Sequence, residues 1–335
     1  MKKTPVIILA GFLGSGKTTT LNHILRSSNG KKIGVIVNDF GEVNIDSLLV
    51  SRQTDNTMEL SGGCICCQMN DGGLDEILAT FSHPNSKIDA IVIEASGIAE
   101  PIDLRKLILY SSNKSISMNG VVYIVDAKNI IDNLKNYPKI NNHIAAADII
   151  VLNKIDLVDK NDLALIKSTI NKINPNSIII QTKEGRLNPG LLFDIDLNTS
   201  KPEQLSLAVG TENSKHDHLH DNFDSISFSS KKPLSPKKFN HFIETLPSNI
   251  YRLKGIIYYG MKGFEQKIII HKVGSHISQS AEEWQNDETP MSNLVAIGVD
   301  IKKQDILNKL KGCIDKEPEN ISPEDMVDIM RLRGL

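Results

Sequence analysis

Residues 11–18 form a glycine-rich segment, GFLGSGKT, with the spacing G-x-x-x-x-G-K-[ST]. Glycines let consecutive backbone N–H groups approach phosphate oxygens, and a following helix adds the positive end of its dipole. We expect Lys17 to reach the β- and γ-phosphates and the Thr18 hydroxyl to ligate Mg²⁺. The alternative is a glycine-rich turn that binds nothing. The residues of this segment predicted to bind nucleotide are Gly11, Gly14, Ser15, Gly16, Lys17, Thr18 and Thr19.

The tetrapeptide Asn153-Lys154-Ile155-Asp156 is a candidate for recognition of the base. The Asp156 carboxylate can accept hydrogen bonds from both N1–H and the 2-amino group of guanine. Adenine offers no such donor pair and would leave the carboxylate unpaired. Asn and Asp after a strand are also ordinary turn formers, so the tetrapeptide alone is a weak signal. Together with the phosphate-binding segment it favours GTP over ATP.

Acidic residues follow two further candidate strands. Glu94 stands where a carboxylate would approach the magnesium shell, and Gly97 could donate its N–H to the γ-phosphate and act as a hinge. Asp39 and Glu42 lie in a candidate switch segment that would sense the γ-phosphate and position water or metal. The alternatives are a strand-ending acid that caps the next helix at Glu94, and solvated loop acids at Asp39 and Glu42. We predict that the catalytic residues are Lys17, Asp39, Glu42, Glu94 and Gly97.

Three of the four cysteines fall within four residues, as Cys64, Cys66 and Cys67. This spacing cannot place all three sulfurs on one face of a regular helix or strand, so we expect a compact loop around a metal ion. Three thiolates suit tetrahedral Zn²⁺ or Cu(I), and an open fourth position suits metal transfer better than a closed structural site. The alternatives are inert buried thiols and a redox pair of Cys64 with Cys67. Cys313 is expected to lie in a core.

A second metal candidate is the run His216-Asp217-His218-Leu219-His220. In an extended chain the side chains of His216, His218 and His220 point the same way and could form an auxiliary metal site. The alternative is a polar linker that happens to contain histidines.

The elements that must position these residues alternate along the first 200 residues. Short Val- and Ile-rich runs indicate buried strands, and amphipathic segments between them indicate helices. This pattern predicts an α/β fold, a P-loop NTPase-like, doubly wound, mainly parallel sheet, followed by a smaller α+β domain. The predicted strands are 6–10, 33–37, 88–93, 120–125, 148–152, 177–180, 225–228, 250–259, 266–271 and 294–299, and the predicted helices are 18–26, 74–81, 102–110, 162–173, 236–246 and 303–313.

Composition predicts where one domain ends and the next begins. The polar, aperiodic stretch TSKPEQLSLAVGTENSKHDHLHD is typical of a linker. We therefore divide the chain into a nucleotide domain, a His-containing linker, a C-terminal α+β domain, and a tail with a short helix beginning near Ser322. The predicted bounds are 1–198, 199–221, 222–314 and 315–335.

Bulk composition excludes several classes of function. Apolar residues make up 40% and charged residues 23% of the 335 residues, as in ordinary globular proteins, and the formal net charge is -2. This small negative net charge would not attract nucleic acid or acidic lipid over a long range. No apolar run approaches the roughly 20 residues that span a bilayer. We expect a cytoplasmic protein with no nucleic-acid or membrane partner.

In this order, the motifs GFLGSGKTTTLNHIL, NDFGEVNID, LSGGCICC, EASGIAEP and NKID resemble the CobW family of P-loop GTPases. Segments around Tyr251–Gly255, Trp284 and Leu294–Gly298 resemble that family's C-terminal domain. The resemblance implies GTP hydrolysis coupled to metal handling, often of zinc, or a role in the cobalamin pathway, with the three clustered cysteines matching the family's metal motif. Asp39 stands where glutamate is commoner, and Val37 where some relatives carry a carboxylate, which leaves the fourth metal ligand open.

The sequence thus predicts a Mg²⁺-dependent GTPase whose nucleotide state controls the affinity for Zn²⁺ or a related divalent metal such as Co²⁺. The expected partners are GTP and GDP, the metal ion and a client metalloprotein, and a homo-oligomer is left open. The alternative is a regulatory GTP-binding protein that assembles or activates a metalloenzyme, with a structural metal.

Overall fold

A computed structural model of the chain describes residues 3–28, 31–37, 57–59, 73–97, 100–193, 224–261, 266–285 and 288–315. The first part is a seven-stranded sheet in the order β3-β2-β4-β1-β5-β6-β7, and every pair is parallel. Its strands are β1 Thr4–Gly11, β2 Ile33–Val37, β3 Thr57–Glu59, β4 Ala90–Glu94, β5 Ile116–Asp126, β6 Ile149–Asn153 and β7 Ile178–Gln181. The helices between them are α1 Lys17–Arg26, α4 Gly73–Ser82, α5 Pro101–Tyr110, α6 Ile130–Asn136, α7 Lys139–Ala145 and α8 Lys160–Ile173.

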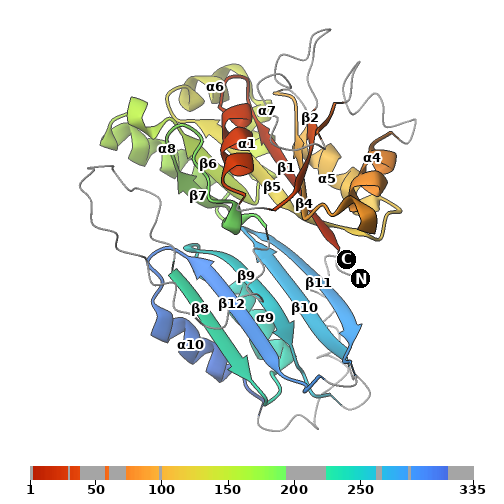
Figure 1. Cartoon of the computed structure of the whole chain (residues 1–335). Helices are drawn as coiled ribbons and strands as arrows, with labels where there is room; N and C mark the ends of the chain where they lie inside the picture. Colours follow the sequence, from red (N-terminus) through yellow and green to blue (C-terminus); the bar gives the residue numbers. More distant parts are fainter. Residues whose placement is uncertain are drawn as a thin grey trace, which may run out of the picture.

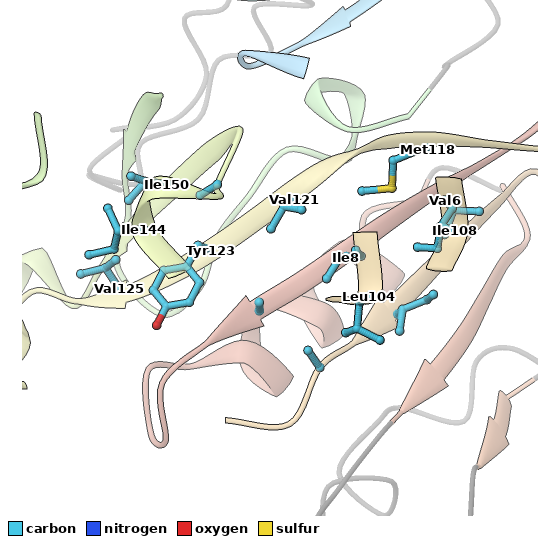
Figure 2. Close-up of a cluster of buried hydrophobic side chains, with 14 of the residues drawn as sticks. Val6, Ile8, Leu104, Ile108, Met118, Val121, Tyr123, Val125, Ile144 and Ile150 are labelled. Atoms are coloured by element: carbon cyan, nitrogen blue, oxygen red, sulfur yellow. The ribbon is translucent and has the colours of Figure 1, made fainter. Parts of the chain in front are cut away.

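Helices cover both faces of this sheet, which confirms the doubly wound prediction (Figure 1). On one face α4, α5, α7 and α8 pack against alternate residues of the strands. Figure 2 shows part of that core, where Leu104 and Ile108 of α5 lie beside Val6 and Ile8 of β1. On the other face α1 and the segment 187–193 bury the remaining strand residues. Strands buried on both sides explain the nearly continuous Val and Ile runs.

The second part is a five-stranded antiparallel sheet in the order β11-β10-β9-β12-β8. Helices α9 and α10 pack on one face of it through Phe239, Phe242, Ile306 and Leu310 (Figure 1). This is the smaller α+β unit that the sequence predicted. Its elements are β8 Asp224–Ser230, α9 Pro236–Glu244, β9 Ile250–Ile257, β10 Gln266–Val273, β11 His276–Glu283, β12 Ser292–Gly298 and α10 Lys303–Gly312.

The two sheets share a hydrophobic contact. Val273 of β10 is buried in the same cluster as α1 and the segment 187–193, and Tyr251 and Ile297 pack against it. Arg252 of β9 adds hydrogen bonds to the backbone oxygens of Gly190, at 3.2 Å, and of Phe193. The antiparallel sheet therefore lies against the α1 face of the parallel sheet.

Two strands and two α-helices of the described residues were not predicted from the sequence: β3, β11, α6 and α7. The short terminal helix expected near Ser322 and the linker 199–221 lie outside the described residues. Among the helices of the described ranges, none combines the length and the apolar character needed to cross a bilayer.

Candidate nucleotide site

The glycine-rich segment connects β1 to α1 at the carboxyl end of the sheet. The backbone of Gly14 has φ +70° and that of Gly16 has φ +102°, both in the left-handed region that favours glycine. A Cβ on Gly16 would stand 2.4 Å from Asn153 Nδ2. Glycine at this position therefore allows the loop and the end of β6 to come together.

Two carbonyls of this loop accept hydrogen bonds from consecutive residues, the last of β6 and the one that follows it. Asn153 Nδ2 donates to Ser15 O at 2.9 Å, and Lys154 Nζ donates to Gly14 O at 2.8 Å. In a trans peptide the N–H of the next residue points opposite to the carbonyl. Because the Ser15 carbonyl is turned toward β6, the Gly16 N–H is directed away from it. The start of α1 carries no acidic side chain in its first turn, so its dipole favours an anion.

Thr18 and Glu94 meet on the other side of the loop. The Thr18 hydroxyl donates to Glu94 Oε1 at 2.7 Å, because β1 pairs with β4 in parallel and places Glu94 opposite Leu9. Glu94 is only 2% exposed. Two hydroxyl oxygens nearby in the chain, Ser15 Oγ and Ser96 Oγ, are buried and have no hydrogen-bond partner among the described residues.

This donor set fits a hard divalent cation beside phosphate. Mg²⁺ takes oxygen ligands and is typically held by one or two protein groups together with waters and phosphate oxygens. A hydroxyl and a carboxylate that lie in hydrogen-bond contact can supply such a site. The unpaired Ser15 and Ser96 hydroxyls are polar atoms that a bound phosphate or its water could satisfy.

Gly97 lies directly against the glycine-rich loop. A Cβ there would stand 2.7 Å from Leu13 Cδ2 and 3.1 Å from the backbone nitrogen of Leu13. The segment after β4 thus reaches the glycine-rich loop. Lys17 begins α1, and its Nζ lies 3.5 Å from Phe12 O. Thr19, two residues after Lys17, is exposed.

The residues predicted to recognise the base, Asn153, Lys154 and Asp156, lie at and just after the carboxyl end of β6. Asn153 Oδ1 accepts from the Gly185 N–H at 3.0 Å, so one side chain joins the glycine-rich loop to the loop after β7. Lys154 has a left-handed backbone with φ +61°. Asp156 lies in a short 3-10 turn, Ile155–Leu157, and is exposed. Its carboxylate is therefore accessible to a ligand.

The protein-family model that describes the CobW/HypB/UreG nucleotide-binding domain matches residues 5–181 of this sequence. The chain belongs to this family. The model for the cobalamin synthesis protein CobW C-terminal domain matches residues 223–314. Two nucleotide-domain motifs that carried the resemblance, the glycine-rich loop and Asn153–Asp156, lie within the first match and meet in the structure.

Two curated relatives and one solved structure are similar to this chain. It is 27% identical to the "Zinc chaperone CobW" of Sinorhizobium sp, covering 89% of this chain and 93% of that protein. It is 36% identical to the "Zinc-regulated GTPase metalloprotein activator 1" of Schizosaccharomyces pombe, covering 59% of this chain and 52% of that relative. The zinc-bound YjiA GTPase from E. coli covers 94% of this chain, and all of its own, at 23% identity with a TM-score of 0.45.

Several predicted site residues of this family member lie outside the described residues. They are Asp39, Glu42, Cys64, Cys66, Cys67, His216, His218 and His220. Within the described ranges, no group of three or more His, Cys, Asp or Glu side chains could hold a metal ion. Cys313 is buried as predicted, and burial raises the pKa of its thiol to about 11. That thiol stays protonated near neutral pH and is a poor metal ligand.

Sequence reasoning missed two parts of the nucleotide site. Asp126, the last residue of β5, accepts a hydrogen bond from Lys154 Nζ at 2.7 Å. The loop 182–186 after β7 reaches Asn153 through Gly185. Asp126 ends one parallel strand and the loop 182–186 follows another, at the edge where such sheets bind ligands. This position at the strand ends was the available signal.

Proposed function

We propose that this chain is a Mg²⁺-dependent GTPase that couples its nucleotide state to the delivery of Zn²⁺, or a related divalent metal, to a client protein. The observation that carries the nucleotide half is the set of contacts around one loop. Thr18 meets Glu94 on the phosphate side, and Asn153 and Lys154 hold the loop carbonyls on the base side. The names of the Sinorhizobium and Schizosaccharomyces relatives support the zinc half.

The chain's own residues have distinct parts in this proposal. Backbone N–H groups of the glycine-rich loop and the Lys17 ammonium bind the phosphates, and Asp156 selects guanine. Thr18 and Glu94 would hold Mg²⁺, which neutralises charge that develops during phosphoryl transfer. Gly97 would sense the γ-phosphate, and Asp39 and Glu42 are proposed to position water or metal in the switch segment. Cys64, Cys66 and Cys67 are the proposed ligands of the delivered metal.

The choice of base can be tested by exchanging the hydrogen-bonding partner. In Asp156→Asn the side chain no longer accepts two hydrogen bonds from guanine, so kcat/KM for GTP should fall about a hundredfold. Xanthine carries a 2-oxo acceptor in place of the amino group, and an asparagine amide can donate to it. The variant should therefore hydrolyse xanthosine triphosphate better than the wild type does. Equal loss for both nucleotides would contradict guanine recognition by Asp156.

Metal coupling can be tested by elemental analysis of bound metals in the nucleotide-free, GDP and GTP-analogue forms. We expect zinc content and affinity to differ between the GDP and GTP-analogue forms, and Cys66→Ser/Cys67→Ser to lose the zinc. The matched control is Cys313→Ser, since this buried thiol lies in the other sheet domain and should leave zinc content unchanged. Identical zinc affinity in both nucleotide forms would rule out the coupling.

A second candidate function is supported by the name of the Schizosaccharomyces relative, a metalloprotein activator. In this function the chain would activate a metalloenzyme by changing that enzyme's conformation. The metal bound to the chain itself would be a structural ion. Incubation of the zinc-loaded protein with an apo-client separates the two functions. Stoichiometric transfer of zinc favours delivery, whereas nucleotide-dependent complex formation without transfer favours activation.

A further inference from the structure

Asp126 ends β5 with a buried carboxylate that is 5% exposed. Three donors surround it. Oδ2 accepts from Lys154 Nζ at 2.7 Å and from Asn129 Nδ2 at 2.9 Å, and Oδ1 accepts from the Lys128 N–H at 2.9 Å. A buried carboxylate with this many donors is held in one orientation, and its charge is compensated by the lysine.

The lysine that pairs with Asp126 also contacts the glycine-rich loop. Lys154 Nζ donates to Gly14 O at 2.8 Å while it is bound to Asp126. A lysine side chain loses rotamer freedom when it is fixed, and a single hydrogen bond to a neutral carbonyl offsets only part of this cost. The charge-assisted bond to Asp126 supplies the larger part of the restraint.

The restraint on Lys154 reaches the peptide between Gly14 and Ser15. Its carbonyl oxygen accepts from Lys154, and its N–H donates to Phe12 O at 3.2 Å. The next carbonyl, that of Ser15, is held by Asn153. Asp126 lies opposite Asn153 in the pairing of β5 with β6, so both restraints start from adjacent positions of the same strand pair.

We propose that Asp126 is a positioning residue for nucleotide binding: through Lys154 it fixes the Gly14 carbonyl and so the orientation of the phosphate-binding loop. This inference rests on the proposed nucleotide function. The Asp126 carboxylate contacts Lys154, Asn129 and the Lys128 N–H, and its effect on the loop passes through Lys154. Without the carboxylate, the lysine and the loop must be ordered when nucleotide binds, which weakens binding.

The test is a double-mutant cycle on nucleotide binding and steady-state kinetics. Asp126→Ala should weaken binding of a fluorescent GDP analogue and raise KM for GTP by about tenfold, with kcat changed less than about threefold. Lys154→Ala should have a similar effect. The double variant Asp126→Ala/Lys154→Ala should be no weaker than Lys154→Ala alone. Asp126→Asn keeps an oxygen acceptor and should recover part of the affinity.

The matched control is Asp132→Ala, which removes an exposed carboxylate paired with Lys135 at 3.2 Å and should leave KM unchanged. Additive effects of Asp126→Ala and Lys154→Ala, or an unchanged KM in Asp126→Ala, would overturn the proposal. If the wild type does not bind guanine nucleotides, the proposed function itself fails, which is a separate outcome. Thermal unfolding of each variant without nucleotide identifies a folding defect, and Asp126→Asn then carries the test.

Discussion

Two glycines of the glycine-rich loop have left-handed backbones but different surroundings. A Cβ on Gly16 would stand 2.4 Å from Asn153 Nδ2, whereas a Cβ on Gly14 would meet no described atom within 4 Å. The first position is restricted by both backbone conformation and close approach, and the second by backbone conformation alone. This contrast separates the two causes of a requirement for glycine.

We predict that Gly16→Ala destabilises the nucleotide-free protein more than Gly14→Ala does. An alanine in the left-handed region costs roughly 1–2 kcal/mol at either position. At Gly16 the added Cβ also displaces Asn153 and breaks its bond to Ser15 O, for a further loss on the order of 1 kcal/mol. Urea unfolding of both variants and the wild type measures the difference. Equal stability of the two variants would show that Asn153 does not restrict this site.

At the level of elements, periodicity predicted the parallel strands because each is buried on both faces and is therefore uniformly apolar. It failed for β11, His276–Glu283, whose residues are mostly polar and half-buried at the edge of the antiparallel sheet. A signal did exist, since Gly274 and Ser275 form a two-residue connection between β10 and β11. Such a pair between two extended segments is typical of a hairpin.

The same physical limit applies to the candidate site. The glycine-rich loop and Asn153–Asp156 are contiguous in the sequence, and their spacing carries the chemistry. Asp126 and Gly185 act through contacts with residues 28 and 32 positions away. Neither lies in a local pattern, so only the order of strands in the sheet reveals their place beside the nucleotide site.

For the whole molecule, one carboxylate joins the two sheets. Asp148 accepts from the Ser275 hydroxyl in the β10–β11 connection at 2.8 Å, from the Val121 N–H at 2.8 Å, and from Arg105 of α5. Next to it, His276 Nε2 lies 2.9 Å from Met118 O of β5. The tip of the hairpin is therefore fixed to the nucleotide domain by polar contacts as well as by the apolar cluster around Val273.

This interface makes stability depend on pH. Burial lowers the pKa of His276, Asp148 opposes this effect and the Arg105 guanidinium adds to it. Near pH 7 His276 is neutral in the folded protein and mainly neutral in the unfolded chain. Below its ordinary pKa of about 6.5 the unfolded chain takes up a proton while the folded state resists it, so stability falls as the pH falls. Burial also lowers the pKa of Lys272 from 10.5 to about 8. This shift changes the stability only between those two values, at alkaline pH.

We predict that His276→Gln reduces the loss of stability between pH 7 and pH 5.5. Glutamine does not titrate, and its amide can still donate to the Met118 carbonyl, so the variant loses the proton linkage but retains a donor. One proton taken up only by the unfolded chain changes the free energy of unfolding by up to about 1.4 kcal/mol per pH unit. Urea unfolding across this range measures the slope for both proteins, and the other histidines cancel in the difference. Parallel curves would show that His276 does not resist protonation at this interface.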